Sequence, residues 1–378
     1  GIAAPATFPL LDGADHRLAI AAGGSHDRLF IDVPLGATSL AVTASSMDSA
    51  QNIGLTVELR RLDFAAALSP PPFAAPPGGA PVVASDTGDG IGGPAVAISG
   101  VSLQPGRWYA VVINGNAADT AIEIRAEVEF LGAAPQPIHR GLWEPSSRPG
   151  LGQGYEYNWG GSDRALIWYT YDEDGQPVWY IAGSPESPDN IWTSPLFRVT
   201  NDGERQQLSR VGYVSVTTLA EDDSMFSYTI FGQSGTERMQ PLSPQTCPDV
   251  DGAERSYTGL WYRGIDGLGG ASVLVSALTQ AQIHYLFDAL GMPRWLVAQD
   301  LGNPEPTNPE LPMLQFSGFC AVCGSAPVSF RTVGMLERTF TDQTNGSWTL
   351  DYLMEAPLSG SVQRTDSIIK LTDTLACE

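Results

Sequence analysis

Positive charge is scarce in this sequence. Lys370 is its only lysine, and 20 basic residues stand against 42 acidic ones, which gives a formal net charge of −22. Nucleic acids and anionic membrane surfaces are bound through clustered lysine and arginine side chains. We therefore expect neither of them to be a partner of this protein.

Long apolar runs and helical patterns are also missing. No segment has the roughly 20 consecutive apolar residues that a membrane-spanning helix needs, and no stretch carries an amphipathic stripe over three helical turns. The apolar runs are short, β-branched or aromatic, and are broken by 41 glycines and 29 prolines. This composition is typical of strands and turns, so we predict an all-β protein without membrane insertion.

The start of the chain shows no signal peptide. Its first residues, Gly1-Ile2-Ala3-Ala4-Pro5, are compatible with a mature chain that follows a processed secretory signal, or with a cloning scar. We therefore expect a bacterial protein that is secreted or held at the cell surface.

Cysteine is limited to four residues in the last third of the chain, namely Cys247, Cys320, Cys323 and Cys377. In an exported protein, cysteines of this kind form disulfides. We expect bonds between Cys247 and Cys377 and between Cys320 and Cys323, although the sequence alone leaves three pairings open. One alternative is a zinc site made of all four thiolates. Another is a redox role for Cys320-Ala-Val-Cys323, which would need a strand–helix context that the sequence lacks.

Residues 1–131 have the pattern of a single β-sandwich. The last apolar run alternates cleanly, so that Ile122, Ile124, Ala126 and Val128 share one face. A segment rich in proline, glycine and alanine between Ser69 and Gly93 is expected to form a long surface loop. The strand candidates are Leu29–Val33, Leu40–Ser45, Gly54–Leu59, Ala95–Ile98, Trp108–Asn114 and Ile122–Phe130.

This first stretch resembles the bacterial pre-peptidase C-terminal domain. The resemblance is carried by the segments His26 to Pro34, Leu40 to Thr43, Leu55 to Leu59 and Gly106 to Val112. Gly54 stands where that family often has an aspartate. The resemblance implies a jelly-roll-like accessory domain of secreted hydrolases and surface proteins, and it implies no chemistry of its own.

An internal repeat organises the remainder of the chain. The matching segments are Gly141-Leu-Trp143 with Gly259-Leu-Trp261, Ile167–Trp179 with Ile283–Trp295, Val211-Gly212 with Val333-Gly334, and Ser234-Gly235 with Ser359-Gly360. We predict two related domains, 140–243 and 256–378, each an antiparallel meander of about eight short strands that forms a barrel or a strongly curved sheet. The repeat resembles a domain of exported gammaproteobacterial proteins that carries the motifs GLW, WYTYDxDGxPxWY and SGT. No activity is established for that domain, so the resemblance implies location and modularity only.

The two copies indicate which strand faces are buried. The apolar positions Ile167, Tyr169 and Tyr171 recur as Ile283, Tyr285 and Phe287, so we expect this face to be core. Trp143 and Trp179 recur as Trp261 and Trp295, which favours a packing role.

Three tryptophans have no tryptophan counterpart in the other copy: Trp168, Trp192 and Trp159. Trp168 lies on the face opposite the expected core. We therefore predict an exposed aromatic platform that binds a ligand, with Trp168 as its main residue. The alternative is that these residues lie at a domain interface or in a half-buried strand.

No pattern of catalytic residues emerges from the sequence. The histidines His16, His26, His139 and His284 lie outside any hydrolase or protease motif. The acids mostly mark turns, although an acid–base pair of carboxylates stays an alternative. The segment Asp86-Thr-Gly-Asp89-Gly could supply oxygen ligands to calcium, but it lacks the full calcium-binding pattern. We predict no enzymatic activity, no metal site and no cofactor.

Three functions are compatible with these features. The first is a non-catalytic binding module whose ligand is a glycan, another extracellular polymer or a protein, since duplicated modules raise avidity. The second is a structural or assembly subunit of a surface layer or filament. The third is the accessory portion of a secreted protease or other hydrolase.

Overall fold

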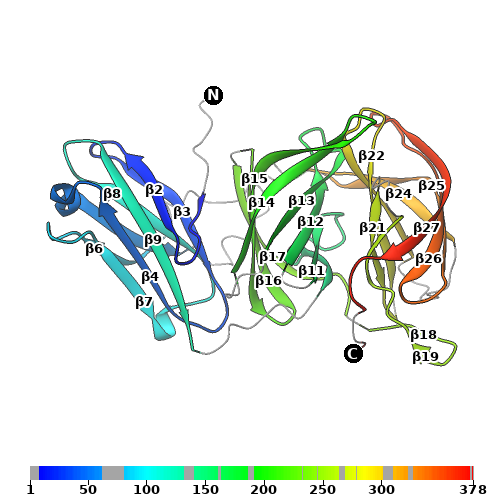
Figure 1. The fold of residues 1–378 in the computed structure, drawn as a ribbon, viewed down its shortest axis with the longest axis horizontal. Helices are drawn as coiled ribbons and strands as arrows, with labels where there is room; N and C mark the ends of the chain where they lie inside the picture. The colour runs from blue at the N-terminus through cyan, green and yellow to red at the C-terminus, as the bar shows by residue number, and fades with distance from the viewer. Residues whose placement is uncertain are drawn as a thin grey trace. The chain divides into compact units, whose positions relative to one another are not determined.

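The protein is described by a computed structural model, and its chain is all-β with short 3₁₀ turns, η1 (Ser49–Gly54) and η3 (Gly100–Ser102) (Figure 1). No helix among the described residues is long and apolar enough to cross a membrane. The described residues are 8–61, 81–131, 140–160, 163–185, 191–231, 233–244, 246–263, 269–277, 279–300, 310–321, 327–374 and 377.

The N-terminal part is a sandwich of two sheets, as predicted. One sheet has the strand order β1-β3-β8-β5-β6 and the other β2-β9-β4-β7. The four alternating residues of β9 that were expected to share a face are all buried in the core of the sandwich. The strands are β1 (Phe8–Pro9), β2 (Asp15–Ile20), β3 (Ser25–Val33), β4 (Ala37–Ser46), β5 (Leu55–Arg61), β6 (Val82–Thr87), β7 (Ala95–Ser99), β8 (Gly106–Asn114) and β9 (Thr120–Phe130).

The prediction of a long surface loop between Ser69 and Gly93 is wrong in part. Residues 62–80 lie outside the described residues, but Val82–Thr87 form β6, which pairs with β5 at the edge of the five-stranded sheet. An edge strand needs only one hydrogen-bonded neighbour, and the side chains of β6 are largely exposed. Its sequence therefore carries little of the apolar alternation by which strands are recognised.

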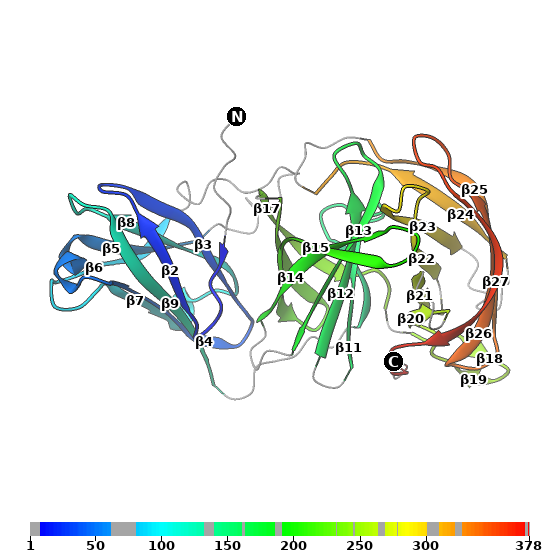
Figure 2. The same ribbon diagram turned by 45° about the horizontal axis from the view of Figure 1, so that its top comes forward.

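The first repeat folds as a closed barrel of consecutive antiparallel strands (Figure 2). The first and last strands pair, with Trp143 opposite Pro241, and this pairing closes the barrel. The strands are β10 (Gly141–Pro145), β11 (Gly154–Gly160), β12 (Asp163–Tyr171), β13 (Pro177–Pro185), β14 (Ile191–Asn201), β15 (Gln206–Ala220), β16 (Asp223–Ile230) and β17 (Gln233–Pro241).

The second repeat forms another closed barrel of the same topology, in which Trp261 lies opposite Lys370. The segment between the two predicted repeat domains contains the two short strands of a hairpin, β18 (Asp249–Val250) and β19 (Ala253–Glu254). The barrel strands are β20 (Gly259–Tyr262), β21 (Gly270–Val275), β22 (Gln280–Phe287), β23 (Pro293–Asp300), β24 (Glu310–Ser317), β25 (Ser329–Phe340), β26 (Asn345–Leu353) and β27 (Ser361–Lys370).

By its internal packing the chain divides into two compact units. One comprises Gly1–Pro137, Ser187–Thr193 and Gly212–Arg238, and the other comprises Ile138–Glu186, Ser194–Val211 and Met239–Glu378. This partition differs from the predicted domains 1–131, 140–243 and 256–378, which stay a prediction. The second unit contains strands of both barrels, and these strands share a buried cluster.

This shared cluster, called here the seam, is built by equivalent residues that contact each other reciprocally. Trp179 donates from Nε1 to the carbonyl of Leu286 (3.1 Å), and Trp295 donates from Nε1 to the carbonyl of Thr170 (2.8 Å). Trp179 and Trp295 are repeat counterparts, and so are Thr170 and Leu286. The two tryptophans are therefore retained because each one anchors its own barrel on the other.

Aromatic contacts at the seam follow the same reciprocity. The ring of Trp295 lies 6.0 Å from that of Tyr169, and the ring of Trp179 lies 5.8 Å from that of its counterpart Tyr285. Backbone bonds repeat the pattern, from Asn201 N to Gly291 O and from Gly318 N to Gly175 O. The face predicted to be core is thus buried between the barrels and not inside either one.

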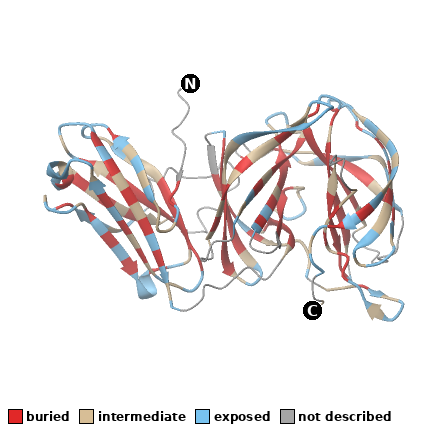
Figure 3. Cartoon of the chain, viewed as in Figure 1, coloured by how far each residue is buried: buried red, intermediate tan, exposed pale blue. Residues whose placement is uncertain are grey.

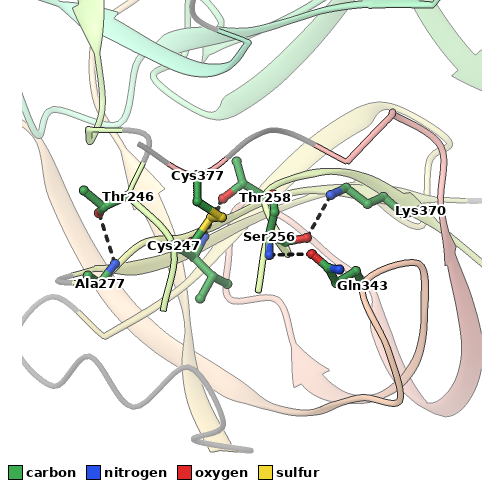
Figure 4. Close-up of a disulfide and its surroundings, with 9 residues drawn as sticks. Thr246, Cys247, Ser256, Thr258, Ala277, Gln343, Lys370 and Cys377 are labelled. Atoms are coloured by element: carbon green, nitrogen blue, oxygen red, sulfur yellow. Dashed lines mark hydrogen bonds between the residues drawn. A yellow bond between two sulfur atoms is a disulfide. The ribbon is translucent and has the colours of Figure 1, made fainter. Parts of the chain in front are cut away.

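The disulfide between Cys247 and Cys377 is confirmed (Figure 4). It excludes a zinc site that would use all four thiolates. Cys320 is also disulfide-bonded, whereas Cys323 lies outside the described residues, so the pairing of these two stays a prediction.

Candidate functional site

Two residues of the expected aromatic platform are buried. Trp168 is 2% exposed and Trp192 is 3% exposed, so the prediction that they face solvent is wrong. Trp168 lies beside Tyr180, at 5.7 Å between ring centres, on the inner face of the first barrel. The side chain of Trp159 lies outside the described residues. A ligand-binding role for these three residues stays a prediction, and the structure directs attention to other surfaces.

An open hollow of about 510 Å³ lies on the wall of the second barrel formed by β25, β26 and β27. This size falls within the range of volumes that ligand-binding sites have. Figure 3 shows that these strands carry exposed and half-exposed positions among buried ones. The hollow is lined by Val333, Gly334, Met335, Asp351, Tyr352, Leu353, Ser361, Val362 and Gln363.

A bulge in β25 accounts for the shape of this wall. Met313 of β24 lies opposite Gly334, but the next residue, Leu314, lies opposite Thr332, so Val333 is an extra residue in β25. A bulge of this kind bends the strand and increases its local twist. A Cβ atom at Gly334 would collide with the backbone oxygen of Asp351, so only glycine permits this close approach of β25 and β26.

Polar and apolar side chains alternate around the hollow. Met335 and Leu353 are 40% and 65% exposed, so both offer apolar surface to a ligand. In the same row of the sheet as Met335, Gln363 donates from Nε2 to Asp351 Oδ2 at 3.3 Å. The arrangement offers a carboxylate and an amide for hydrogen bonds, next to apolar surface.

Only the second barrel presents this face. The pairs Met335–Asp351 and Tyr213–Thr229 occupy equivalent register positions in the two barrels. Thr229 is buried and Tyr213 is half-buried, whereas Met335 and Asp351 are exposed. Sequence reasoning missed this site because exposed Leu353 and Met335 look like ordinary alternating strand residues. The recurrence of Val-Gly at 211–212 and 333–334 was the available signal for the bulge.

The two aspartates of the candidate calcium segment accept hydrogen bonds from backbone N–H groups, as aspartates in turns do. Asp89 Oδ1 accepts the backbone N–H groups of Ile91 (2.9 Å) and Gly92 (3.0 Å), and these bonds lower the pKa of Asp89. Asp86 Oδ2 accepts the N–H of Ala95 at 2.7 Å. Within the described part of the chain, no group of three histidine, cysteine, aspartate or glutamate side chains is placed to hold a metal ion.

A buried acid with a raised pKa lies at the seam. Glu156 of β11 is 1% exposed, and its Oε1 accepts a hydrogen bond from Asn158 at 2.5 Å, while Oε2 has no hydrogen-bond partner. Burial raises the pKa of Glu156 to about 7, against the opposing effects of Asn158, Ser272 and the positive charge of Lys370. Ser272 is the repeat counterpart of Glu156, so the second copy avoids a second carboxylate at this place.

We expect Glu156→Gln to flatten the pH dependence of stability. The folded state holds the Glu156 proton up to a pKa of about 7, while the unfolded chain releases it near 4.5. The contribution of Glu156 to the free energy of unfolding is therefore fully present below pH 4.5 and is lost as the pH rises through 7. The loss is on the order of 3 kcal/mol. Urea unfolding at pH 5 and pH 7.5 measures the change for the wild type and the variant.

The exposed acid Glu337 provides the matched control for this experiment. Glu337→Gln should leave the difference between the two pH values as it is in the wild type. An identical pH dependence in Glu156→Gln and the wild type would contradict the assignment of Glu156.

No protein-family model matches this chain, and no curated protein matches it. The two resemblances described above therefore stay predictions.

Proposed function

We propose that this protein is a secreted or cell-surface, non-catalytic binding module that holds a neutral extracellular polymer, such as a glycan, in the hollow over β25, β26 and β27. The observation that carries the proposal is the combination, in one open hollow, of the exposed apolar residues Met335 and Leu353 with the hydrogen-bonding pair Asp351 and Gln363. Sugar rings present apolar faces and hydroxyl groups side by side, which is the pattern that such a lining complements.

The negative charge of the protein favours a neutral ligand over an anionic one. The chain carries a net charge of −22, and Asp351 places a carboxylate in the hollow itself. A polyanionic glycan would be repelled by this field, and the repulsion would be strongest at low salt.

The disulfide between Cys247 and Cys377 supports an oxidising location. Disulfides persist outside the cytosol, in extracellular and periplasmic settings. The open and shallow form of the hollow favours a chain-like ligand that passes over the barrel wall, since a small molecule would gain more from an enclosed cavity.

Binding to a panel of neutral polysaccharides tests this proposal. Co-sedimentation and calorimetry with soluble and insoluble β-glucans, xylan, mannan and chitin should identify a polymer that binds the wild type saturably. Asp351→Ala should weaken that binding by roughly 10-fold or more, because it removes hydrogen bonds from a charged acceptor. Leu353→Ala should weaken it through lost apolar contact.

The control is Leu290→Ala, which removes another highly exposed leucine, on the β22–β23 turn and outside the hollow. It should bind as the wild type does. The proposal fails if no polymer in the panel binds, or if Asp351→Ala and Leu353→Ala bind as tightly as Leu290→Ala.

A further inference from the structure

The interior of the second barrel contains a buried cation. Arg338 of β25 is 4% exposed. Its terminal nitrogens donate to Gln282 Oε1 at 3.1 Å and to Gln280 Oε1 at 2.5 Å, and its guanidinium carbon lies 4.6 Å from the ring centre of Phe340. All these partners are neutral.

No carboxylate in the described part of the chain forms an ion pair with Arg338. The nearby wall does carry Asp366, but its oxygens accept from Trp348 Nε1 (3.1 Å), Arg364 Nε (2.8 Å) and Arg263 (3.3 Å). Burial is the cause that lowers the pKa of Arg338, to about 10, so the group keeps its charge at neutral pH. A buried charge without a counter-ion is costly, because the barrel interior solvates it far less well than water does.

The fold itself does not require this cation. In the first barrel, Val216 occupies the position equivalent to Arg338, and Leu166 and Trp168 stand where the second barrel has Gln282 and His284. The first barrel also buries an arginine, Arg164 of β12, which stands where the second barrel has Gln280, but it has apolar side chains at the two following inward positions and opposite them at Val216. The polar row along β22 and the cation facing it occur together in the second barrel only.

The polar row is arranged as a chain of hydrogen bonds. Gln282 accepts from Arg338 through Oε1, and its Nε2 lies 2.8 Å from His284 Nε2. Burial and the charges of Arg338 and Arg364 lower the pKa of His284 to about 3, so the ring is neutral. With Nε2 accepting from the amide, the ring proton resides on Nδ1, which makes His284 a further donor.

We propose that Arg338, together with Gln280, Gln282 and His284, forms a buried site for a small inorganic monoanion such as chloride. A guanidinium has five N–H donors, and the two glutamine carbonyls accept from two of its nitrogens, so donors remain for an anion. The ligand has to be small, because Gln280 and Gln282 are fully buried and the interior around them is filled by packed side chains.

Thermal unfolding in chloride and in gluconate tests this site. Both sodium salts are used at the same ionic strength, and gluconate is too large to enter. We expect chloride to raise the Tm of the wild type by about 2–4 °C relative to gluconate, with saturation, because a ligand that binds only the folded state stabilises it. Arg338→Met should abolish this difference, and the exposed control Arg331→Met should keep it.

A second variant and a direct measurement complete the test. If Arg338→Met does not fold, Gln282→Leu, which installs the residue of the first barrel, should reduce the chloride effect. Crystals grown in bromide should show an anomalous peak beside the Arg338 guanidinium. The proposal is overturned if the wild type melts identically in the two salts, if Arg338→Met retains the chloride effect, or if bromide gives no peak at this place.

Discussion

Trp295→Ala is expected to lower the free energy of unfolding by about 3–5 kcal/mol, which is the usual cost of truncating a fully buried tryptophan. Trp295 is 0% exposed and lies among the rings of Tyr169, Tyr171 and Phe316, at 5.5–6.0 Å between centres. Its removal leaves a cavity at the seam and leaves the carbonyl of Thr170 without its indole donor. Chemical denaturation followed by circular dichroism measures the loss.

The reciprocal arrangement of the seam makes this prediction specific. Trp179→Ala should cause a comparable loss, because Trp179 makes the equivalent contacts with Tyr285, Phe287 and the carbonyl of Leu286. Leu290→Ala, on the exposed turn just before Trp295, should change stability by less than about 0.5 kcal/mol. A loss below about 1 kcal/mol for both tryptophan variants would show that the seam does not hold the barrels together.

Removal of the disulfide through the double variant Cys247→Ala/Cys377→Ala is expected to cost about 4–5 kcal/mol in the chain-entropy model. The two cysteines are 130 residues apart, and their bond ties the segment before β20 to the end of the chain beyond β27. It therefore fastens the ends of the second barrel where β20 and β27 pair through only two residues on each strand. Without the bond, the unfolded chain gains the freedom of a very long loop.

The surroundings of the disulfide allow the effect to be located. Lys370 donates from Nζ to the carbonyl of Ser256 at 3.1 Å, and Ser256 N donates to Gln343 at 2.8 Å, so the same end of the barrel is also held by hydrogen bonds (Figure 4). Hydrogen exchange in the double variant should increase first at β20 and β27. Unchanged stability, with exchange at these strands as slow as in the wild type, would refute the role given to this bond.

Several features of the protein follow from its sequence alone. Short β-branched and aromatic runs between glycines and prolines determined the all-β class, because no other periodicity is present. The recurrence from Gly141 and Gly259 onwards determined that the chain contains two related meanders, which the structure closes into two barrels. The positions of Cys247 and Cys377 on either side of the second copy indicated their pairing, which the structure confirms.

The tertiary structure decided what each strand face contacts. Alternation with a period of two separates two faces, but it does not state what lies against either of them. In the second half of β12 and in β22 both faces are buried, one inside a barrel and one at the seam. The residues that the copies share, such as Tyr169 and Trp179, belong to the seam, and the residues that differ, such as Trp168 and His284, fill the interiors.

The candidate binding hollow also depended on tertiary structure. It exists because one extra residue, Val333, bends β25, and a shift of one residue between paired strands leaves no mark in the composition or periodicity of either strand. The closure of each barrel likewise depends on tertiary structure. The pairing of β10 with β17 and of β20 with β27 joins segments about 100 residues apart. The sequence by itself determined most of the segments that become strands, and only the packing of those strands decided which side chains are left for a ligand to reach.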